Sequence, residues 1–119
     1  MADVTVKHMD ALESYEGGGR FLYARKGLGV TSFGMNVERF PAGYAEYPEH
    51  DHARDGQEEV YLVLEGHATL RAGDESFELP SGTFARVGPG QRRKIVPGAD
   101  GVTILAIGGI PGKVFEPGL

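Results

Sequence analysis

Residues 58–66 read Glu58-Glu59-Val60-Tyr61-Leu62-Val63-Leu64-Glu65-Gly66, and the predicted fold depends on this stretch more than on any other. In an extended strand, the odd-numbered side chains from Glu59 to Val63 share one face and the even-numbered ones share the other. Both faces are therefore largely apolar, which is typical of a strand near the centre of a sheet. Gly66 follows and predicts the end of this strand.

The segments on either side repeat the same short-strand pattern. Upstream, Phe33, Met35 and Val37 alternate with small or polar residues, and Pro41 follows, which predicts a half-buried strand and a turn. Downstream, apolar runs between glycine and proline turns predict strands at residues 68–71, 76–79, 83–87, 92–96 and 102–107. Strands so closely spaced leave no room for crossover helices, so we expect an antiparallel all-β sandwich or barrel. The residues expected to be mostly buried are Phe33, Met35, Tyr61, Val63, Phe77 and Ile104.

The length of 119 residues is enough for one domain with one hydrophobic core. The first twenty residues lack the strand pattern, so we expect residues 1–20 to be an N-terminal arm and residues 21–119 to be a single barrel domain. Within the arm, Asp10 and Glu13 have the spacing of a helix-capping pair and predict a short helix through Tyr15.

Charge and composition exclude several classes of function. The net charge is −5 at pH 7, which argues against nucleic acid and anionic membranes as partners because both require a positive surface. The chain has no cysteine, so disulfides, thiolate metal sites and thiol catalysis are excluded. No apolar run approaches the ~18 residues of a membrane-spanning helix. We therefore expect a soluble, cytoplasmic protein.

His50 and His52 are the candidate metal ligands. Residues two apart in an extended strand project to the same side about 6.6 Å apart, so both imidazoles can converge on one ion. If the next strand lies alongside, Glu59 adds a carboxylate. This set of two histidines and one carboxylate leaves coordination positions open on Fe, Mn, Ni or Zn. Tyr44 and Tyr47 flank the histidines and are candidates for the rim of a pocket.

The order of these residues resembles the first of two motifs of the cupin family. That motif reads Gly, five residues, His, one residue, His, three or four residues, Glu, six residues, Gly. Here Gly43, His50, His52, Glu59 and Gly66 occur in the same order. The last interval matches, whereas six residues separate Gly43 from His50 and six separate His52 from Glu59.

The second cupin motif reads Gly, five residues, Pro, one residue, Gly, two residues, His, three residues, Asn. The residues at these positions are Gly82, Gly88, Gly90, Arg93 and Pro97, so both glycines are present and the other three residues are replaced. The resemblance extends from about residue 33 to residue 107. It implies a double-stranded β-helix, or jelly roll, often dimeric, whose interior holds a metal and a small ligand.

Arg93 stands where the resemblance places the fourth metal ligand. A unit charge ~6 Å from a divalent ion, at an effective dielectric constant of ~20, opposes metal binding by roughly 5 kcal/mol. In one interpretation Arg93 takes the place of the metal and neutralises Glu59 through a bidentate pair. In the other, Arg93 binds a carboxylate or phosphate of a ligand, which can itself contact a metal on the histidines.

Two functions from different classes follow. The first is a barrel that binds a small anionic molecule, with Arg93, Tyr61 and Gln57 in contact with the ligand; Gln57 shares the face of Glu59. The second is a metal-dependent enzyme of oxygenase or isomerase type. Its single divalent metal would be held by His50, His52 and Glu59. The residues leave open whether the protein is an enzyme.

We also expect a homodimer. A small barrel has exposed sheet edges, and the arm carries apolar residues of its own that a twofold partner could cover by strand addition. These residues are Val4, Val6, Met9 and Leu12.

Overall fold

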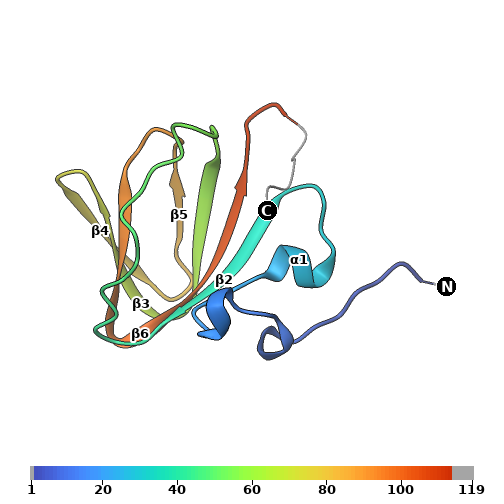
Figure 1. The fold of residues 1–119 in the computed structure, drawn as a ribbon. Coiled ribbons are helices and arrows are strands. Elements are labelled where there is room, and N and C mark those ends of the chain that lie inside the picture. Colours follow the sequence, from blue (N-terminus) through green and yellow to red (C-terminus); the bar gives the residue numbers. More distant parts are fainter. Residues whose placement is uncertain (1, 114–119) are drawn as a thin grey trace.

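The computed structural model describes residues 2–113 of the chain, and within them six strands form one curled antiparallel sheet (Figure 1). The order across the sheet is β1-β2-β6-β3-β4, and β5 pairs with the first part of β3. The predicted all-β barrel is confirmed. The strands are β1 (Phe21–Leu22), β2 (Gly34–Phe40), β3 (Glu58–Ala72), β4 (Glu75–Pro80), β5 (Phe84–Val87) and β6 (Arg93–Gly109).

The two longest strands, β3 and β6, pair with each other along most of their lengths and lie at the centre of the sheet. The prediction that the strand ends at Gly66 is wrong, because β3 bends there and continues to Ala72. Gly66 has a φ of 81°, and the register shifts on both sides of it. A Cβ at this position would collide with the carbonyl oxygen of Gly101, so only glycine fits.

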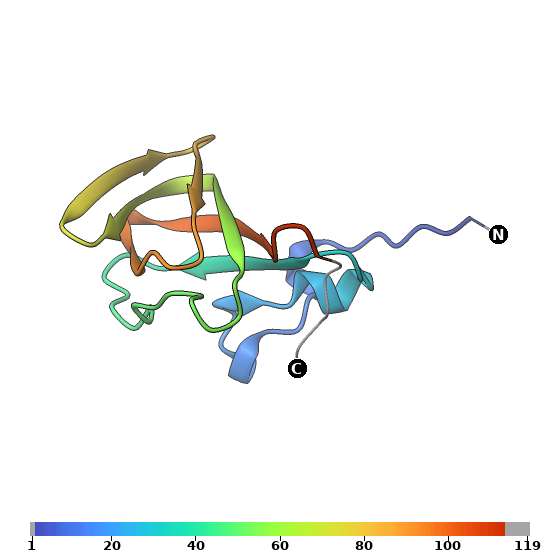
Figure 2. The same ribbon diagram turned by 90° about the horizontal axis from the view of Figure 1, so that it is seen from above.

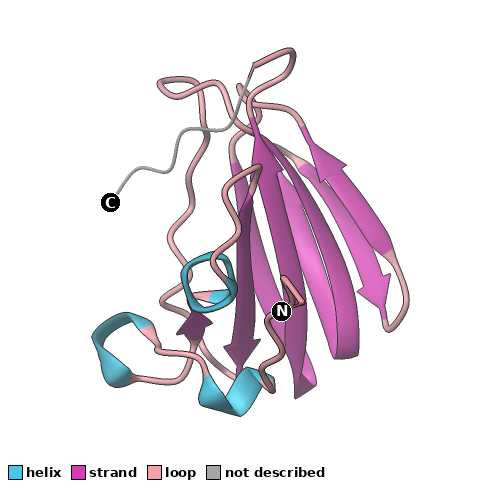
Figure 3. Cartoon of the chain, turned by 90° about the vertical axis from the view of Figure 1, so that its right-hand side faces the viewer, coloured by secondary structure: helices cyan, strands magenta, loops and turns pink. Residues whose placement is uncertain are grey.

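The strands predicted at 92–96 and 102–107 are likewise one continuous strand, β6. The predicted hairpin at 68–79 is confirmed as the pairing of β3 with β4. Figure 3 shows the sheet curving around the interior, with the helical turns gathered at one edge. The largest apolar cluster lies on the inner face, and Tyr61, Val63 and Ile104 are fully buried in it, as predicted.

The two faces of β2 are both covered, which the sequence pattern did not predict. On the outer face, Val37 packs with Leu22 and Ala24 in a second apolar cluster. On the inner face, Glu38 and Phe40 are buried, and Phe40 belongs to the main core. Glu38 therefore points into the barrel, whereas Arg39 on the outer face pairs with Asp10. The prediction of a half-buried strand is wrong for the second half of β2, where residues on both faces are buried.

Two of the six residues expected in the core are too exposed to belong to it. Phe33 is 37% exposed because it precedes the first residue of β2, and Phe77 is 46% exposed because β4 pairs with a neighbour on one side only. Met35 is partly buried against the outer cluster. Periodicity places a side chain on a face, but coverage of that face depends on neighbouring elements.

The helix predicted from Asp10 to Tyr15 is wrong. This segment instead forms two short 3-10 turns, Met9–Ala11 and Tyr15–Gly17, and the side chain of His8 accepts a hydrogen bond from the backbone N–H of Asp10. An unpredicted helix, α1 (Ala24–Leu28), packs beside β2 (Figure 1). Figure 2 shows the N-terminal residues extending away from the barrel. No helix among the described residues is long and apolar enough to span a membrane.

Candidate metal and ligand site in the barrel

The two histidines lie in the long connection between β2 and β3. His50 is fixed by a two-way backbone bridge to the start of β6: its N–H donates to the carbonyl of Arg93 at 3.0 Å, and the N–H of Arg93 donates back at 2.8 Å. The N–H of His52 donates to the carbonyl of Pro89 at 2.8 Å. Residues 50–52 were expected to be extended, but only His50 forms a β-bridge. The side chains of His50 and His52 still point toward β3.

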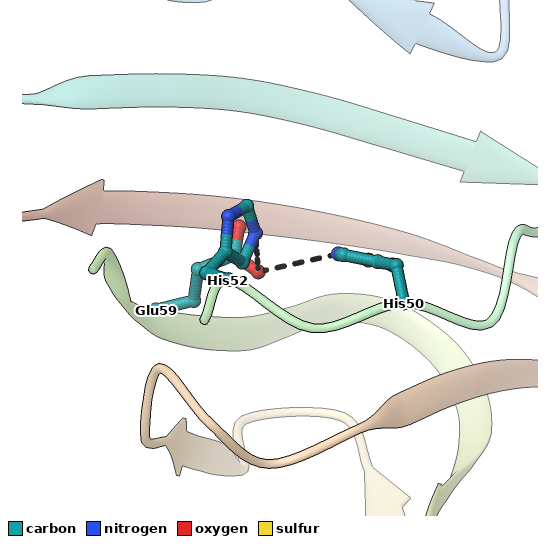
Figure 4. A group of neighbouring side chains, drawn as sticks. All are labelled: His50, His52 and Glu59. Atoms are coloured by element: carbon teal, nitrogen blue, oxygen red, sulfur yellow. Dashed lines mark hydrogen bonds and ion pairs between the residues drawn. The ribbon is translucent and has the colours of Figure 1, made fainter. Parts of the chain in front are cut away.

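His50, His52 and Glu59 converge as predicted (Figure 4). Their potential ligand atoms all lie within 4.8 Å of one another. The Nε2 atom of His52 is 3.1 Å from Oε1 of Glu59, and the Nε2 atom of His50 is 3.7 Å from the same oxygen. The three side chains could hold one metal ion. We call them the triad.

The outer nitrogens of both rings are held by acceptors. Nδ1 of His50 lies 2.9 Å from the carbonyl oxygen of Pro48, and Nδ1 of His52 lies 3.1 Å from the carboxylate of Asp55. Since these oxygens only accept, each Nδ1 must donate, and the Nε2 of a neutral ring then carries a lone pair. Both lone pairs would face Glu59, another acceptor. A proton or a metal ion is therefore required between the Nε2 atoms and the Glu59 carboxylate. Histidines that bind a metal through Nε2 commonly donate their Nδ1–H to an acceptor in the same way.

The charges of the triad are coupled. The Glu59 carboxylate raises the pKa of His50 because it stabilises the protonated ring. Burial alone would raise the pKa of Glu59, but the close approach of His50, the hydrogen bond from Tyr61 and the nearby charges of His52 and Arg93 outweigh it and lower the pKa. The carboxylate is therefore ionised at neutral pH.

Arg93 is fully buried beside the triad. Its Nη2 donates to the carbonyl oxygen of Gly88 at 3.1 Å, and its Nη1 lies 3.5 Å from Oε1 of Glu59. The bidentate pair with Glu59 that one interpretation predicts is therefore wrong, because the two groups meet through a single ion pair. Neither Nε nor Nη1 has a hydrogen-bond partner among the described residues. Arg93 is thus a buried cation with unused donors.

The other predicted ligand contacts fall in different places. The hydroxyl of Tyr61 donates to Oε1 of Glu59 at 2.8 Å, so this side chain lies at the triad. Gln57 is directed toward Asp55 instead, with its amide nitrogen 3.2 Å from that carboxylate. Tyr47 is buried rather than at a rim, and its hydroxyl lies 3.2 Å from that of Tyr61. Burial raises the pKa of both hydroxyls, so both remain protonated.

Glu38 is the interior residue that the sequence interpretation missed. It is 6% exposed, and its Oε1 has no hydrogen-bond partner among the described residues. Burial raises its pKa to about 8, and the negative charge of Glu59 adds to the shift. The sequence did hold a signal for Glu38. The family resemblance implies that the ligand lies inside the barrel, so a charged residue in a predicted strand could have been considered as an inward-facing one.

No family model matches the sequence, and no curated protein matches it. The structure, however, superposes on a cupin protein from Bacteroides fragilis with a TM-score of 0.74 and 21% identity, covering 99% of this chain and 93% of that one. The chain has the cupin fold. Other cupin barrels match over less of the chain. One is a cupin-superfamily sugar phosphate isomerase from Silicibacter pomeroyi, with a TM-score of 0.65, 23% identity, and coverage of 74% of this chain and 57% of that one.

A third match is KdgF from a Halomonas species, with a TM-score of 0.58, 15% identity, and coverage of 66% of this chain and 69% of that one. In the cupin barrel described here, three side chains of the implied ligand set converge as a metal site requires. The fourth position holds Arg93, which donates no electron pair and carries a positive charge. The donor set therefore fits a three-ligand metal site and does not fit the four-ligand one.

Proposed function

We propose that this cupin barrel binds a small anionic molecule and that Arg93 is its anchor. The observation that carries the proposal is the full burial of Arg93, whose Nε and Nη1 have no hydrogen-bond partner among the described residues, with only the 3.5 Å ion pair of Nη1 to Glu59 nearby. A buried charge whose donors are unused is costly, and a carboxylate or phosphate oxygen would satisfy both nitrogens. Tyr61 and the histidines would form the polar wall around the anion.

The charge balance around Glu59 supports an anionic ligand. Glu59 is the negative member of the triad, and Arg93 and a protonated His50 outweigh it. Because the pKa of His50 is raised, a larger fraction of this ring is protonated near neutral pH. We therefore expect anion binding to strengthen as the pH falls through the pKa of His50, as long as Glu59 and Arg93 keep their charges.

The second candidate function is metal-dependent, and the observation that favours it is the donation of both Nδ1 atoms to fixed acceptors. His50 and His52 would hold the metal through Nε2, and Glu59 would hold it through Oε1. Bound there, Fe, Mn, Ni or Zn would supply Lewis-acid chemistry to an oxygenated substrate. Arg93 would orient the anionic end of that substrate and offset its charge. A fold neighbour described as a sugar phosphate isomerase favours the isomerase form of this alternative.

Calorimetric titration with inorganic phosphate and with malate tests the anion site. We expect Arg93→Met to lose about 2–5 kcal/mol of binding free energy, because the anion loses its buried partner. Arg92→Met is the matched control, since Arg92 is exposed and lies 3.8 Å from Glu49 at the surface. Equal affinities in wild type and Arg93→Met for whichever anion binds, or no binding of either anion to the wild type, would contradict the proposal.

We also propose that the chain forms a homodimer. Val4 and Val6 in the arm are exposed, as are Leu64 and Phe84 on the barrel. A second copy could cover these apolar side chains, and the unpaired edges of β4 and β5 are available for strand addition. Light scattering at micromolar concentration should give twice the mass of 12.8 kDa. A monomer mass there would contradict the dimer, and removal of residues 2–7 should weaken it.

A further inference from the structure

A cavity of about 650 Å³ lies apart from the triad, between the N-terminal segment and the loop that leads to the histidines. Its volume is within the range of ~300–1,000 Å³ typical of small-molecule pockets. None of the triad residues lines it. We call it the N-terminal pocket, and the lining residues that matter here are Tyr15, Arg20, Tyr23, Asn36, Tyr44 and Glu46.

The walls of the N-terminal pocket are held in place by the fold. One wall is residues 14–23, which double back through a bridge between Ser14 and Leu22 and are tied to β2 by the β1 pairing. The other wall is the loop 44–48. Tyr44 anchors it, because its ring stacks on Phe40 at 4.9 Å and the guanidinium of Arg20 lies 5.2 Å from its other face. The two walls are thus locked together before any ligand arrives.

The pocket has hydrogen-bonding capacity that the protein does not use. Among the side chains that the structure describes, no hydrogen bond or ion pair engages the side chains of Asn36 or Glu46, or the hydroxyls of Tyr23 and Tyr44. Arg20 makes one hydrogen bond, from Nη1 to the carbonyl oxygen of Gly18 at 3.4 Å, and keeps further donors free. The lining therefore combines donors, acceptors and aromatic rings around one cavity.

The chemistry of this pocket differs from that of the barrel site. The charges of Arg20 and Glu46 cancel, so the lining presents no net charge that would select an anion. Tyr47 separates the two sites, since its ring centroid lies 6.5 Å from Phe21 of the pocket and 5.7 Å from His50 of the triad. A ligand of the N-terminal pocket would therefore contact other side chains than the anion proposed for Arg93.

We propose that the N-terminal pocket binds a neutral saccharide. A sugar ring presents hydroxyl groups that both donate and accept, and it presents C–H faces that pack on aromatic rings. Glu46 would accept from the hydroxyls, Arg20 would donate to them, and the Asn36 amide would do both. Tyr15 and Tyr23 would supply the apolar faces. The inference goes beyond the proposed function and does not depend on it.

Titration of the isotope-labelled protein with D-glucose, D-galactose and N-acetylglucosamine, each up to about 50 mM, tests the proposal by amide chemical shifts. We expect at least one sugar to shift the amides of Tyr23, Asn36 and Tyr44 with millimolar affinity. Tyrosine fluorescence offers a second readout, because the chain has five tyrosines and no tryptophan. No shift with any of the three sugars, or shifts confined to residues outside the pocket, would overturn the proposal.

Substitutions at exposed positions should leave the fold intact, so a loss of sugar binding can be assigned to the pocket. Arg20→Ala and Glu46→Ala should each weaken the binding of the active sugar roughly tenfold, the effect of losing one hydrogen bond to a charged group. Arg71→Ala is the matched control, because Arg71 is exposed on the distant β3–β4 hairpin. Arg93→Met should leave sugar binding unchanged, so failure of the anion proposal is distinguishable. Equal losses in Arg20→Ala and Arg71→Ala would refute the assignment.

Discussion

Val37 and Glu38 are neighbours on β2, and each is 6% exposed, yet they lie in opposite environments. Val37 faces outward into an apolar cluster formed with Leu22 and Ala24 of the covering segment. Glu38 faces inward, toward the interior that also contains Glu59 and Arg93, and its Oε1 has no partner among the described residues. The same degree of burial therefore stabilises the protein on one face of the strand and destabilises it on the other.

The contrast between Val37 and Glu38 shows where buried polar groups lower the stability of the fold. Burying Val37 contributes about 1.5–3 kcal/mol, because apolar surface leaves water. Burying an unpartnered carboxyl or guanidinium opposes folding unless a proton or a ligand satisfies it. Buried polar groups without partners are concentrated in the barrel interior, at Glu38 and Arg93. The unpartnered polar groups thus lie in the interior, where the anion site is proposed, and the outer cluster is apolar.

The largest expected effect comes from changing the charge of the interior. We expect Arg93→His to bind Zn²⁺ or Ni²⁺ at least a hundredfold more tightly than the wild type. The substitution removes a repulsion of roughly 5 kcal/mol toward a divalent ion and adds an imidazole beside the triad. Equilibrium dialysis followed by elemental analysis measures it, in protein without a histidine tag.

Arg92→His is the control for this change, because position 92 is exposed and should gain no affinity. Equal metal affinity in wild type and Arg93→His would show that the charge of Arg93 does not weaken metal binding at the triad. Stoichiometric metal in native wild type, retained in Arg93→Ala, would instead favour the metal-dependent alternative.

The next effect is a pH dependence that only the inner face of β2 should show. The pKa of Glu38 is raised by burial to about 8, so the folded state holds a proton that the unfolded state releases. The stabilisation from this proton is fully present below the unfolded pKa and is lost as pH rises through the folded one. Between about pH 5 and pH 9, the wild type should lose on the order of 4 kcal/mol relative to Glu38→Gln.

Urea unfolding at several pH values measures this difference. Glu65→Gln is the matched control, because Glu65 is exposed on β3 and should show the wild-type pH dependence. Parallel stability curves for wild type and Glu38→Gln would show that Glu38 does not hold a proton in the interior.

The smallest of the three effects concerns the outer face. We expect Leu22→Ala to lower the free energy of unfolding by about 3 kcal/mol, because it leaves a cavity in the cluster around Val37. Phosphate affinity should not change, since this cluster does not contact the triad or Arg93. Chemical denaturation and the phosphate titration measure the two quantities on the same protein.

Thr31→Ala is the control, because Thr31 is exposed outside the strands and its truncation should cost less than about 1 kcal/mol. A drop in phosphate affinity in Leu22→Ala would show that the two faces are coupled and would break the comparison between them.

The sequence alone was sufficient for the fold class, for the central strand at residues 58–66 and for the three residues of the triad. The alternation from Glu59 to Val63 placed a carboxylate on the face shared with two buried apolar residues, and this face is the interior. His50 and His52 were identifiable because ligand chemistry depends on residue type and close spacing. These are local properties, which period-two geometry transmits directly from sequence to structure.

Other features of the site depended on contacts that the strand pattern does not specify. Gln57 was expected beside Glu59 but lies toward Asp55, since a side chain in a loop takes whichever partner its neighbours offer. Tyr47 was expected at a rim and is buried, because Phe21 and Phe40 pack against its ring. The Tyr47 contacts join residues far apart in the sequence, whereas the contact of Gln57 with Asp55 is local but lies in a loop, where no period-two pattern sets the direction of a side chain.

The sequence by itself determined that the chain forms an antiparallel barrel and which residues form the triad, because both follow from short-range periodicity and chemical type. Only the tertiary structure decided that Glu38 of β2 points inward, that β3 bends at Gly66 instead of ending there, and that Arg93 lies buried with unused donors. The physical reason is the same in each case. Burial is set by what covers a face, and here the covering segments come from elsewhere in the chain.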